Sequence, residues 1–367
     1  MPRTTTSDRT KISERLLGKA DEFPAYFELY ESLVAHGSAH IIQIDQPRES
    51  DSASHDDILW IVELLKGNPR VTWAELNSQV HEQNLSSITT SGINKAVNIA
   101  VQAMIMVDCA ARDRHSTTYE VDSYRPISWE PSEPFLDFVQ RAFPRDSEGD
   151  RRRIKQALRN RYILKAWKLK KRLGVTFRMT DNLMEHLLYD SHNQVLYLFH
   201  QTAFLKAHLK RSSAHLAMEC SLEESLKLGT VPPQLLVETL HSLQAVLFPI
   251  LDDKSADILV RLTKKMGFDD DCNQYDGYMR FKEPPEDFTY HYWGGRLARL
   301  EELVIRREPR NKLERWFRWY TTDVNALAIA LLALAISIVV GLIGIVISSI
   351  QLWIAWEAWR YPVAPPV

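Results

Sequence analysis

The stretch from Val324 to Trp356 carries no charged side chain. A helix of about 20 apolar residues is long enough to cross the hydrocarbon core of a bilayer. A surface helix of a soluble domain keeps a polar face toward water, and this stretch has none. The sequence therefore predicts one transmembrane helix at residues 324–356, and with it a membrane protein whose partner is the lipid bilayer.

The charged residues on the two sides of this span differ in number. A membrane-proximal basic group precedes it: Arg306, Arg307, Arg310, Lys312, Arg315 and Arg318. The short tail after it contains only Glu357 and Arg360 as charged residues. Cations collect on the cytoplasmic side of a membrane, so we expect a cytosolic N-terminal body and a lumenal or external tail. The position of the span predicts a tail-anchored protein, and its length favours the endoplasmic reticulum over the mitochondrial outer membrane.

Small residues recur on one face of the predicted membrane helix: Ser337, Gly341, Gly344 and Ser348. Small side chains let two helix backbones approach closely, and serine can donate a hydrogen bond across the contact. This pattern predicts that the span self-associates or pairs with another membrane helix. Alanine, glycine and serine are also common in spans that make no such contact, so both interpretations stay open.

Bulk composition excludes few classes of protein. Charged residues make up 25% of the chain and the net charge is -2, which gives no overall attraction to nucleic acid or to anionic lipid. Cys109, Cys220 and Cys272 lie far apart, a spacing that argues against a disulfide framework and fits a reducing compartment. No apolar run follows the basic residues at the N-terminus, so a secretory signal peptide is not predicted.

Helical periodicity dominates the rest of the chain and predicts a mainly α fold. We expect a helical soluble body with a winged-helix-like N-terminal part and a single C-terminal transmembrane helix. The predicted segments are a disordered N-terminus at 1–15, a winged-helix-like domain at 16–145, a basic connecting helix at 146–173, a second helical domain at 174–305, a basic juxtamembrane segment at 306–323, the transmembrane helix at 324–356 and a short tail at 357–367.

The winged-helix outline comes from three short helices followed by a hairpin. The first helix is predicted at 57–66 and the third at 90–107, and the second begins at the T-x-x-E capping box of Thr72 and Glu75. The hairpin strands are predicted at 105–109 and 118–121. The third helix would present Asn94, Lys95, Asn98 and Gln102. A single cation is too few for a helix that binds phosphates, so nucleic acid is an unlikely partner and an unknown cytosolic protein is the favoured one.

Residues 151–172 contain many lysines and arginines and no acid. A basic helix that also contains tryptophan and leucine is typical of contact with an anionic membrane surface or an acidic partner. The simpler interpretation, which we favour, is a connecting helix whose cations are solvated.

The region from 174 to 305 reads as further helices with one strand. Capped helices are predicted from Thr180 to residue 188, from Ser221 to Gly229 and from 252 to 266, and Glu224 completes the capping box of the second. Other helices are predicted at 201–210 and 233–251. A strand is predicted at 195–200.

Candidate chemistry is sparse in this region. Five of its histidines cluster in sequence: His186, His192, His200, His208 and His215. No pair has the H-E-x-x-H spacing of a zinc site, and the acidic run at 269–271 lacks the ligand pattern of a calcium loop. No phosphate-binding or nucleophile motif occurs. We therefore predict no catalytic, cofactor-binding or metal-ligating residue and no cofactor.

Several segments together resemble a large family of uncharacterised fungal proteins from filamentous ascomycetes. The segments are GVTFRMTDNLMEHL, FHQTAFLKAHL, LGTVPPQLLVETLHSLQAVLFPI, YHYWGGRLARLEEL and the terminal IQLWIAWEAWRYP. The resemblance covers roughly 170–362 and implies a helical cytosolic body with a C-terminal membrane segment. It implies no chemistry.

Two classes of function fit these observations. The favoured one is a cytosolic helical scaffold, held at a membrane, that recruits a partner protein. The alternative is a membrane-bound enzyme, or an accessory to one, whose site is assembled from residues that no linear motif reveals. A deep pocket lined by convergent polar side chains would favour the enzyme.

Overall fold

The computed structural model describes residues 4–20, 22–36, 53–82, 89–112, 120–121, 124–213, 215–218, 220–275, 288–306 and 326–360. Within these residues the protein is mainly helical, as predicted. The chain divides into two compact units, Met1–Ile305 and Arg306–Val367. A single hydrophobic core runs through the first unit from Ile12 to Val304. The predicted connecting segment at 146–173 therefore does not separate two domains.

The first helix, α1 (Thr6–Leu17), corrects the prediction of disorder at 1–15. Thr5 and Asp8 form a capping box at its start, and Gly18 ends it with a φ of 72°. Ile12, Leu16 and Leu17 are buried in the core. Polar composition suggested disorder, but three apolar residues on one helix face are enough to dock the segment.

The next helices are α2 (Pro24–His36), α3 (His55–Gly67), α4 (Trp73–Glu82), α5 (Thr90–Ile105) and α6 (Phe135–Ala142). The predicted capping box is present, since the backbone N–H of Thr72 donates to Glu75 over 3.0 Å and that of Glu75 donates to the Thr72 hydroxyl over 3.3 Å.

The predicted hairpin is not confirmed. Residues 105–109 are not a strand, because α5 continues to Ile105 and Met106 then turns the chain with a φ of 55°. Of the second predicted strand, residues 118 and 119 lie outside the described residues, and Val121 makes an isolated bridge to Tyr124.

The basic segment is not one long helix. It forms α7 (Arg151–Arg159), a 3-10 turn at Arg161–Ile163 and α8 (Ala166–Leu173). The break lets Ile154, Ile163 and Leu169 all reach the core. The side chain of Asn160 fixes the turn, because its amide donates to the buried Glu301 over 2.7 Å.

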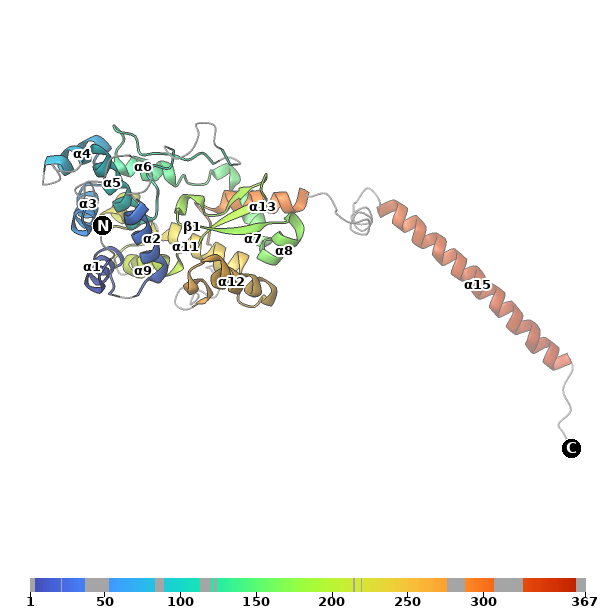
Figure 1. Ribbon diagram of the computed structural model, residues 1–367. Coiled ribbons are helices and arrows are strands. Elements are labelled where there is room, and N and C mark those ends of the chain that lie inside the picture. The colour runs from blue at the N-terminus through green and yellow to red at the C-terminus, as the bar shows by residue number, and fades with distance from the viewer. Residues whose placement is uncertain are drawn as a thin grey trace. The chain divides into compact units, whose positions relative to one another are not determined.

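A small three-stranded sheet lies among these helices in the first unit (Figure 1). Its strands are β1 (Thr176–Thr180), β2 (Leu188–Asp190) and β3 (Val195–Phe199), in the order β1-β3-β2. β1 is parallel to β3 and β2 is antiparallel to it. The strand predicted at 195–200 is confirmed. The helix predicted from Thr180 is wrong, because β1 ends there and a 3-10 turn at Leu183–Glu185 leads into β2.

The remaining helices of the first unit are α9 (Thr202–Ser213), α10 (Leu222–Lys227), α11 (Pro233–His241), which continues as a π-helix over Ser242–Leu247, α12 (Asp253–Met266) and α13 (Gly294–Arg306). Four of these helices were predicted, although the one predicted at 233–251 ends at Leu247, and α13 was not predicted. The Ser221–Glu224 capping box is present, and Gly267 ends α12 with a φ of 74°.

The second unit contains one long helix, α15 (Ala326–Arg360). Its 25 residues from Ala333 to Glu357 are long and apolar enough to cross a membrane, and none of this stretch is buried within the protein. Of the membrane-proximal basic residues, Arg306 ends α13. Arg307, Arg310, Lys312, Arg315 and Arg318 lie outside the described residues.

Candidate functional site

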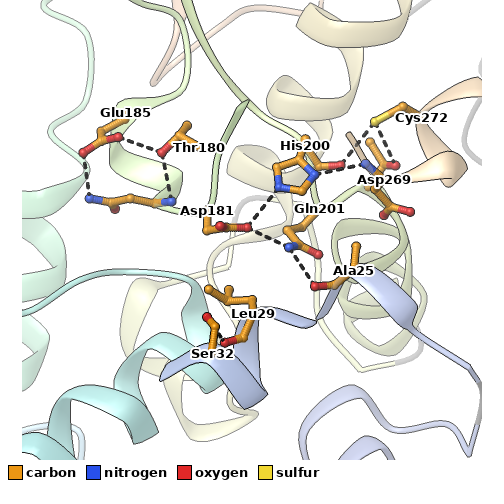
Figure 2. A network of polar contacts seen from close by, with 12 residues as sticks. Ala25, Leu29, Ser32, Thr180, Asp181, Glu185, His200, Gln201, Asp269 and Cys272 are labelled. Carbon is orange, nitrogen blue, oxygen red and sulfur yellow. Dashed lines mark hydrogen bonds and ion pairs between the residues drawn. The ribbon is translucent and has the colours of Figure 1, made fainter. Parts of the chain in front are cut away.

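The histidine that most resembles a catalytic residue, His200, lies directly after β3 (Figure 2). Its Nε2 is 3.0 Å from Asp181 Oδ1, and its Nδ1 accepts the backbone N–H of Asp269 over 3.0 Å. Because Nδ1 is an acceptor, Nε2 carries the proton and donates it to the carboxylate. Both ring nitrogens are therefore engaged, so the imidazole offers no free lone pair for a general base.

Cys272 lies beside this histidine but is not paired with its ring. The thiol donates to the backbone carbonyl of His200 over 3.2 Å, and the Thr202 hydroxyl donates to the sulfur over 3.5 Å. Burial raises the pKa of the Cys272 thiol well above its usual value. A nucleophilic cysteine needs a lowered pKa and a neighbouring base, so this cysteine, histidine and aspartate do not form a catalytic triad.

The acidic run at 269–271 has a structural role in the same region. The carboxylate of Asp269 accepts the backbone N–H of Ala203 in the first turn of α9 over 3.0 Å and that of Asp271 over 3.1 Å. Asp271 forms an ion pair with Lys206 at 2.6 Å. Gln201, next to His200, donates to Asp181 over 2.7 Å and to the Ala25 carbonyl over 3.2 Å (Figure 2). These contacts join α2, β3, α9 and the segment after α12.

A second polar cluster is centred on Glu238, which is fully buried in α11. Its carboxylate accepts three consecutive backbone N–H groups, those of His291 at 2.5 Å, Tyr292 at 2.9 Å and Trp293 at 3.0 Å. The side-chain amide of Gln234 donates to it over 2.8 Å. Burial raises the pKa of Glu238 to about 7, while these four donors favour the ionised form and oppose the shift. We call Glu238 and its donors the Glu238 cluster.

The residues that follow in the chain extend this cluster to the start of α13. The indole N–H of Trp293 donates to the Thr239 hydroxyl over 2.8 Å. The backbone N–H of Gly295 donates to Asp146 over 3.1 Å. A Cβ atom on Gly294 would lie 2.7 Å from Ile154 and 2.8 Å from Asp146, so only glycine fits this approach.

Arg296, in the first turn of α13, is a half-buried cation in this region. Its guanidinium donates to the carbonyl of Met184 over 2.8 Å and to that of His186 over 2.5 Å. It also lies 4.9 Å from the centre of the Trp293 ring. Burial lowers the pKa of Arg296 to about 10. The segment 291–296 thus ties α11, the 3-10 turn before β2 and α13 into one unit.

The other histidines do not come together. His186 and His208 are buried and His192 and His215 are exposed. Among the residues that the structure describes, no group of three or more histidine, cysteine, aspartate or glutamate side chains could hold a metal ion. In α5, Asn98 and Gln102 are buried, and Asn98 accepts the backbone N–H of Cys109 over 3.0 Å. This face of the third helix of the predicted winged helix therefore packs inside the protein.

The predicted membrane-helix contacts, Ser337, Gly341, Gly344 and Ser348, all lie on α15 and are exposed. A Cβ atom on Gly341 or Gly344 would meet no atom within 4 Å. The sequence analysis did not identify Glu238, Asp146 or Arg296. One signal was available, because Glu238 is the single charged residue in the stretch 235–251.

No protein-family model, curated protein or solved structure was found to match this chain.

Proposed function

We propose that this protein is a single-pass membrane protein whose helical unit, residues 1–305, lies in the cytosol and recruits a partner protein. The observation that supports the membrane assignment is α15. Its candidate span of 25 residues would extend about 37 Å, and the hydrocarbon core of a bilayer is about 30 Å thick. Its apolar side chains are exposed, for example Ile345 at 64% and Val340 at 62%. Lipid would cover this surface, which water solvates unfavourably.

The orientation and the target membrane are further parts of the proposal. The cations at 306–318 support an orientation with the helical unit in the cytosol and the tail after α15 on the other side of the membrane. We favour tail-anchored insertion into the endoplasmic reticulum.

A recruiting role fits the polar chemistry of the unit better than catalysis does. The side chains of Cys272, His200 and Glu238 are buried, and each makes hydrogen bonds within the fold. Among the winged-helix-like elements, α4 has an exposed polar face, which includes Glu75, Ser78 and Gln79. We propose that a cytosolic partner binds there, and we expect no nucleic acid to bind.

Proximity labelling of the tagged protein tests this proposal. The full chain should label membrane proteins and one or more cytosolic partners, and a variant that lacks residues 324–360 should lose the membrane neighbours. Alkaline extraction of membranes gives an independent measurement, since a spanning helix resists it. If the two chains give the same neighbours, or the full chain is extracted at high pH, the membrane-held scaffold is wrong.

Self-association of α15 is a separate prediction. Replacing Ser337, Gly341 and Gly344 together with leucine should reduce dimer formation in a membrane assay, because the larger side chains keep the helix backbones apart. A triple change of Val339, Val340 and Val346 to leucine is the matched control, since it alters other positions of the same span. Equal dimer formation by both variants would show that the small residues make no helix contact.

We also propose that the chain belongs to the fungal family it resembles. The motifs that carry the resemblance include Glu238 and the residues from His291 to Trp293 that donate to it. An alignment of such proteins should keep Glu238 and Gly294 together. Independent variation of the two residues would argue against a shared fold.

A further inference from the structure

A surface that neither polar cluster explains lies where α8 meets the loop before α12. Ile250 and Leu251 occupy this loop, after the π-helix that ends at Leu247, and they are 54% and 95% exposed. Two adjacent large aliphatic side chains at a loop tip make little contact with their own chain. Such exposure is unfavourable in water, so a partner surface would stabilise it.

Aromatic rings and lysines alternate beside this tip. Lys168 Nζ lies 4.6 Å from the centre of the Tyr162 ring and 5.5 Å from that of Trp167. Lys254 Nζ, from α12, lies 4.8 Å from the centre of the same Trp167 ring. Tyr162 is 55% exposed. The tip and the alternating rings and lysines belong to one surface, because Lys165 at the start of α8 pairs with Asp252 at 2.8 Å, directly after Leu251.

We call this the α8–α12 surface, and it consists of Tyr162, Trp167, Lys168, Ile250, Leu251 and Lys254. Its charge is mainly positive. Lys170, Lys171 and Arg172 are exposed on α8 next to it, while Asp253 and Asp257 are the exposed acids on the facing helix α12. Burial and then the nearby cations Arg172 and Lys165 lower the pKa of Lys168.

We propose that the α8–α12 surface binds a bilayer surface that contains anionic phospholipid. The chemistry of the three residue types matches the three layers of such a surface. Ile250 and Leu251 would enter the upper acyl region, Tyr162 and Trp167 would lie at the headgroup level, and the lysines would contact phosphates. A protruding tip fits a deformable lipid surface, whereas a folded protein partner would need a matching cavity.

This inference rests on the proposed membrane anchoring, because α15 would hold the unit at a bilayer. Tethering raises the effective concentration of lipid at the α8–α12 surface, so a contact that is weak by itself becomes populated. The unit would then have two attachments to one membrane: an apolar span and a salt-sensitive surface contact.

The test uses the full chain reconstituted through α15 into vesicles. A fluorophore is attached to Leu251→Cys, and spin-labelled lipid quenches it on contact. The native cysteines are buried, so the label is directed to the new thiol. We expect strong quenching in vesicles with about 30% phosphatidylserine and little in pure phosphatidylcholine, because anionic lipid attracts each basic residue near the surface. The matched control is the same label on Gln79→Cys in α4, which should stay unquenched.

Charge-reversal variants separate the surface contact from the anchor. Lys168→Glu with Lys254→Glu should reduce quenching at position 251, since each cation near an anionic surface contributes about fivefold to binding. Arg15→Glu with Arg112→Glu changes the net charge equally on other elements and should leave the quenching unchanged. Resistance to alkaline extraction reports on α15 alone, so failure of the anchor is recognised separately. Equal quenching at 251 and 79 in the anionic vesicles would overturn the proposal.

Discussion

Replacing Glu238 with alanine should lower the free energy of unfolding of the helical unit by about 3–6 kcal/mol. The change removes the acceptor of three backbone N–H groups, those of residues 291–293, and leaves them buried without a partner. Each unsatisfied buried donor costs about 1–3 kcal/mol. A domain of this kind is stable by about 5–15 kcal/mol in total, so this single change approaches the whole margin.

Two further variants show whether the orphaned donors are the cause. Glu238→Gln keeps the volume but points an amide N–H₂ at N–H donors, so we expect an intermediate loss. Gln234→Ala removes one of the four donors and leaves the carboxylate its backbone bonds, so about 1 kcal/mol should be lost. Chemical denaturation of the detergent-solubilised chain measures all three. A loss for Glu238→Ala no larger than for Gln234→Ala would mean that the cluster does not hold 291–293.

Local signals in the sequence predicted local structure well. Thr72 with Glu75 and Ser221 with Glu224 are capping boxes within one helical turn, and Gly267 ends α12 through its own backbone freedom. Each of these features depends on residues at most a few positions apart. The candidate membrane span within 324–356 was also predicted from the sequence, because it depends on length and composition alone.

Errors arose where distant residues decide the outcome. Thr176–Thr180 is a strand because it pairs with Val195–Phe199 across the sheet. This long-range pairing outweighs the local pattern that predicted a helix starting at Thr180. Residues 151–172 bend because Asn160 bonds to Glu301, far along the chain. The Glu238 cluster has the same character, since its backbone donors come from residues 291–293. No linear motif encodes such a contact.

Acid should destabilise the helical unit strongly, and the buried histidines are the main cause. Burial lowers the pKa of His186 and His208 to about 3 and that of His241 to about 4. In the unfolded chain these side chains titrate near 6.5. Below that pH the unfolded state takes up protons that the folded state does not bind, so stability is lost as the pH falls.

Each ring is buried, so its charged form would lose hydration in the folded state. His186 accepts the Phe199 backbone N–H at Nδ1, so a proton there would face a donor. His241 contacts the Tyr290 hydroxyl at 2.7 Å. Neither ring nitrogen of His208 has a hydrogen-bond partner among the described residues, and its ring lies 4.1 Å from that of Phe204.

The expected size follows from the width of the pH interval. Between pH 7.5 and 5 each of the three histidines should remove about 2 kcal/mol, or about 6 kcal/mol together. Glu238 acts in the opposite direction, because its folded pKa of about 7 lies above its ordinary value, so its contribution to stability grows as the pH falls from 7 toward 4.5. A net loss of about 3–4 kcal/mol remains, which thermal unfolding across this interval would detect.

His208→Phe provides the sharpest test, because a phenyl ring fits an apolar site and has no proton to gain. The variant should match or exceed the wild type in stability at pH 5 and should lose about 2 kcal/mol less than the wild type between pH 7.5 and 5. His192→Phe is the matched control, since His192 is exposed and its replacement should leave the pH slope unchanged. An unaltered slope in His208→Phe would show that this histidine is protonated inside the fold, which would require an acceptor or a water molecule at its ring.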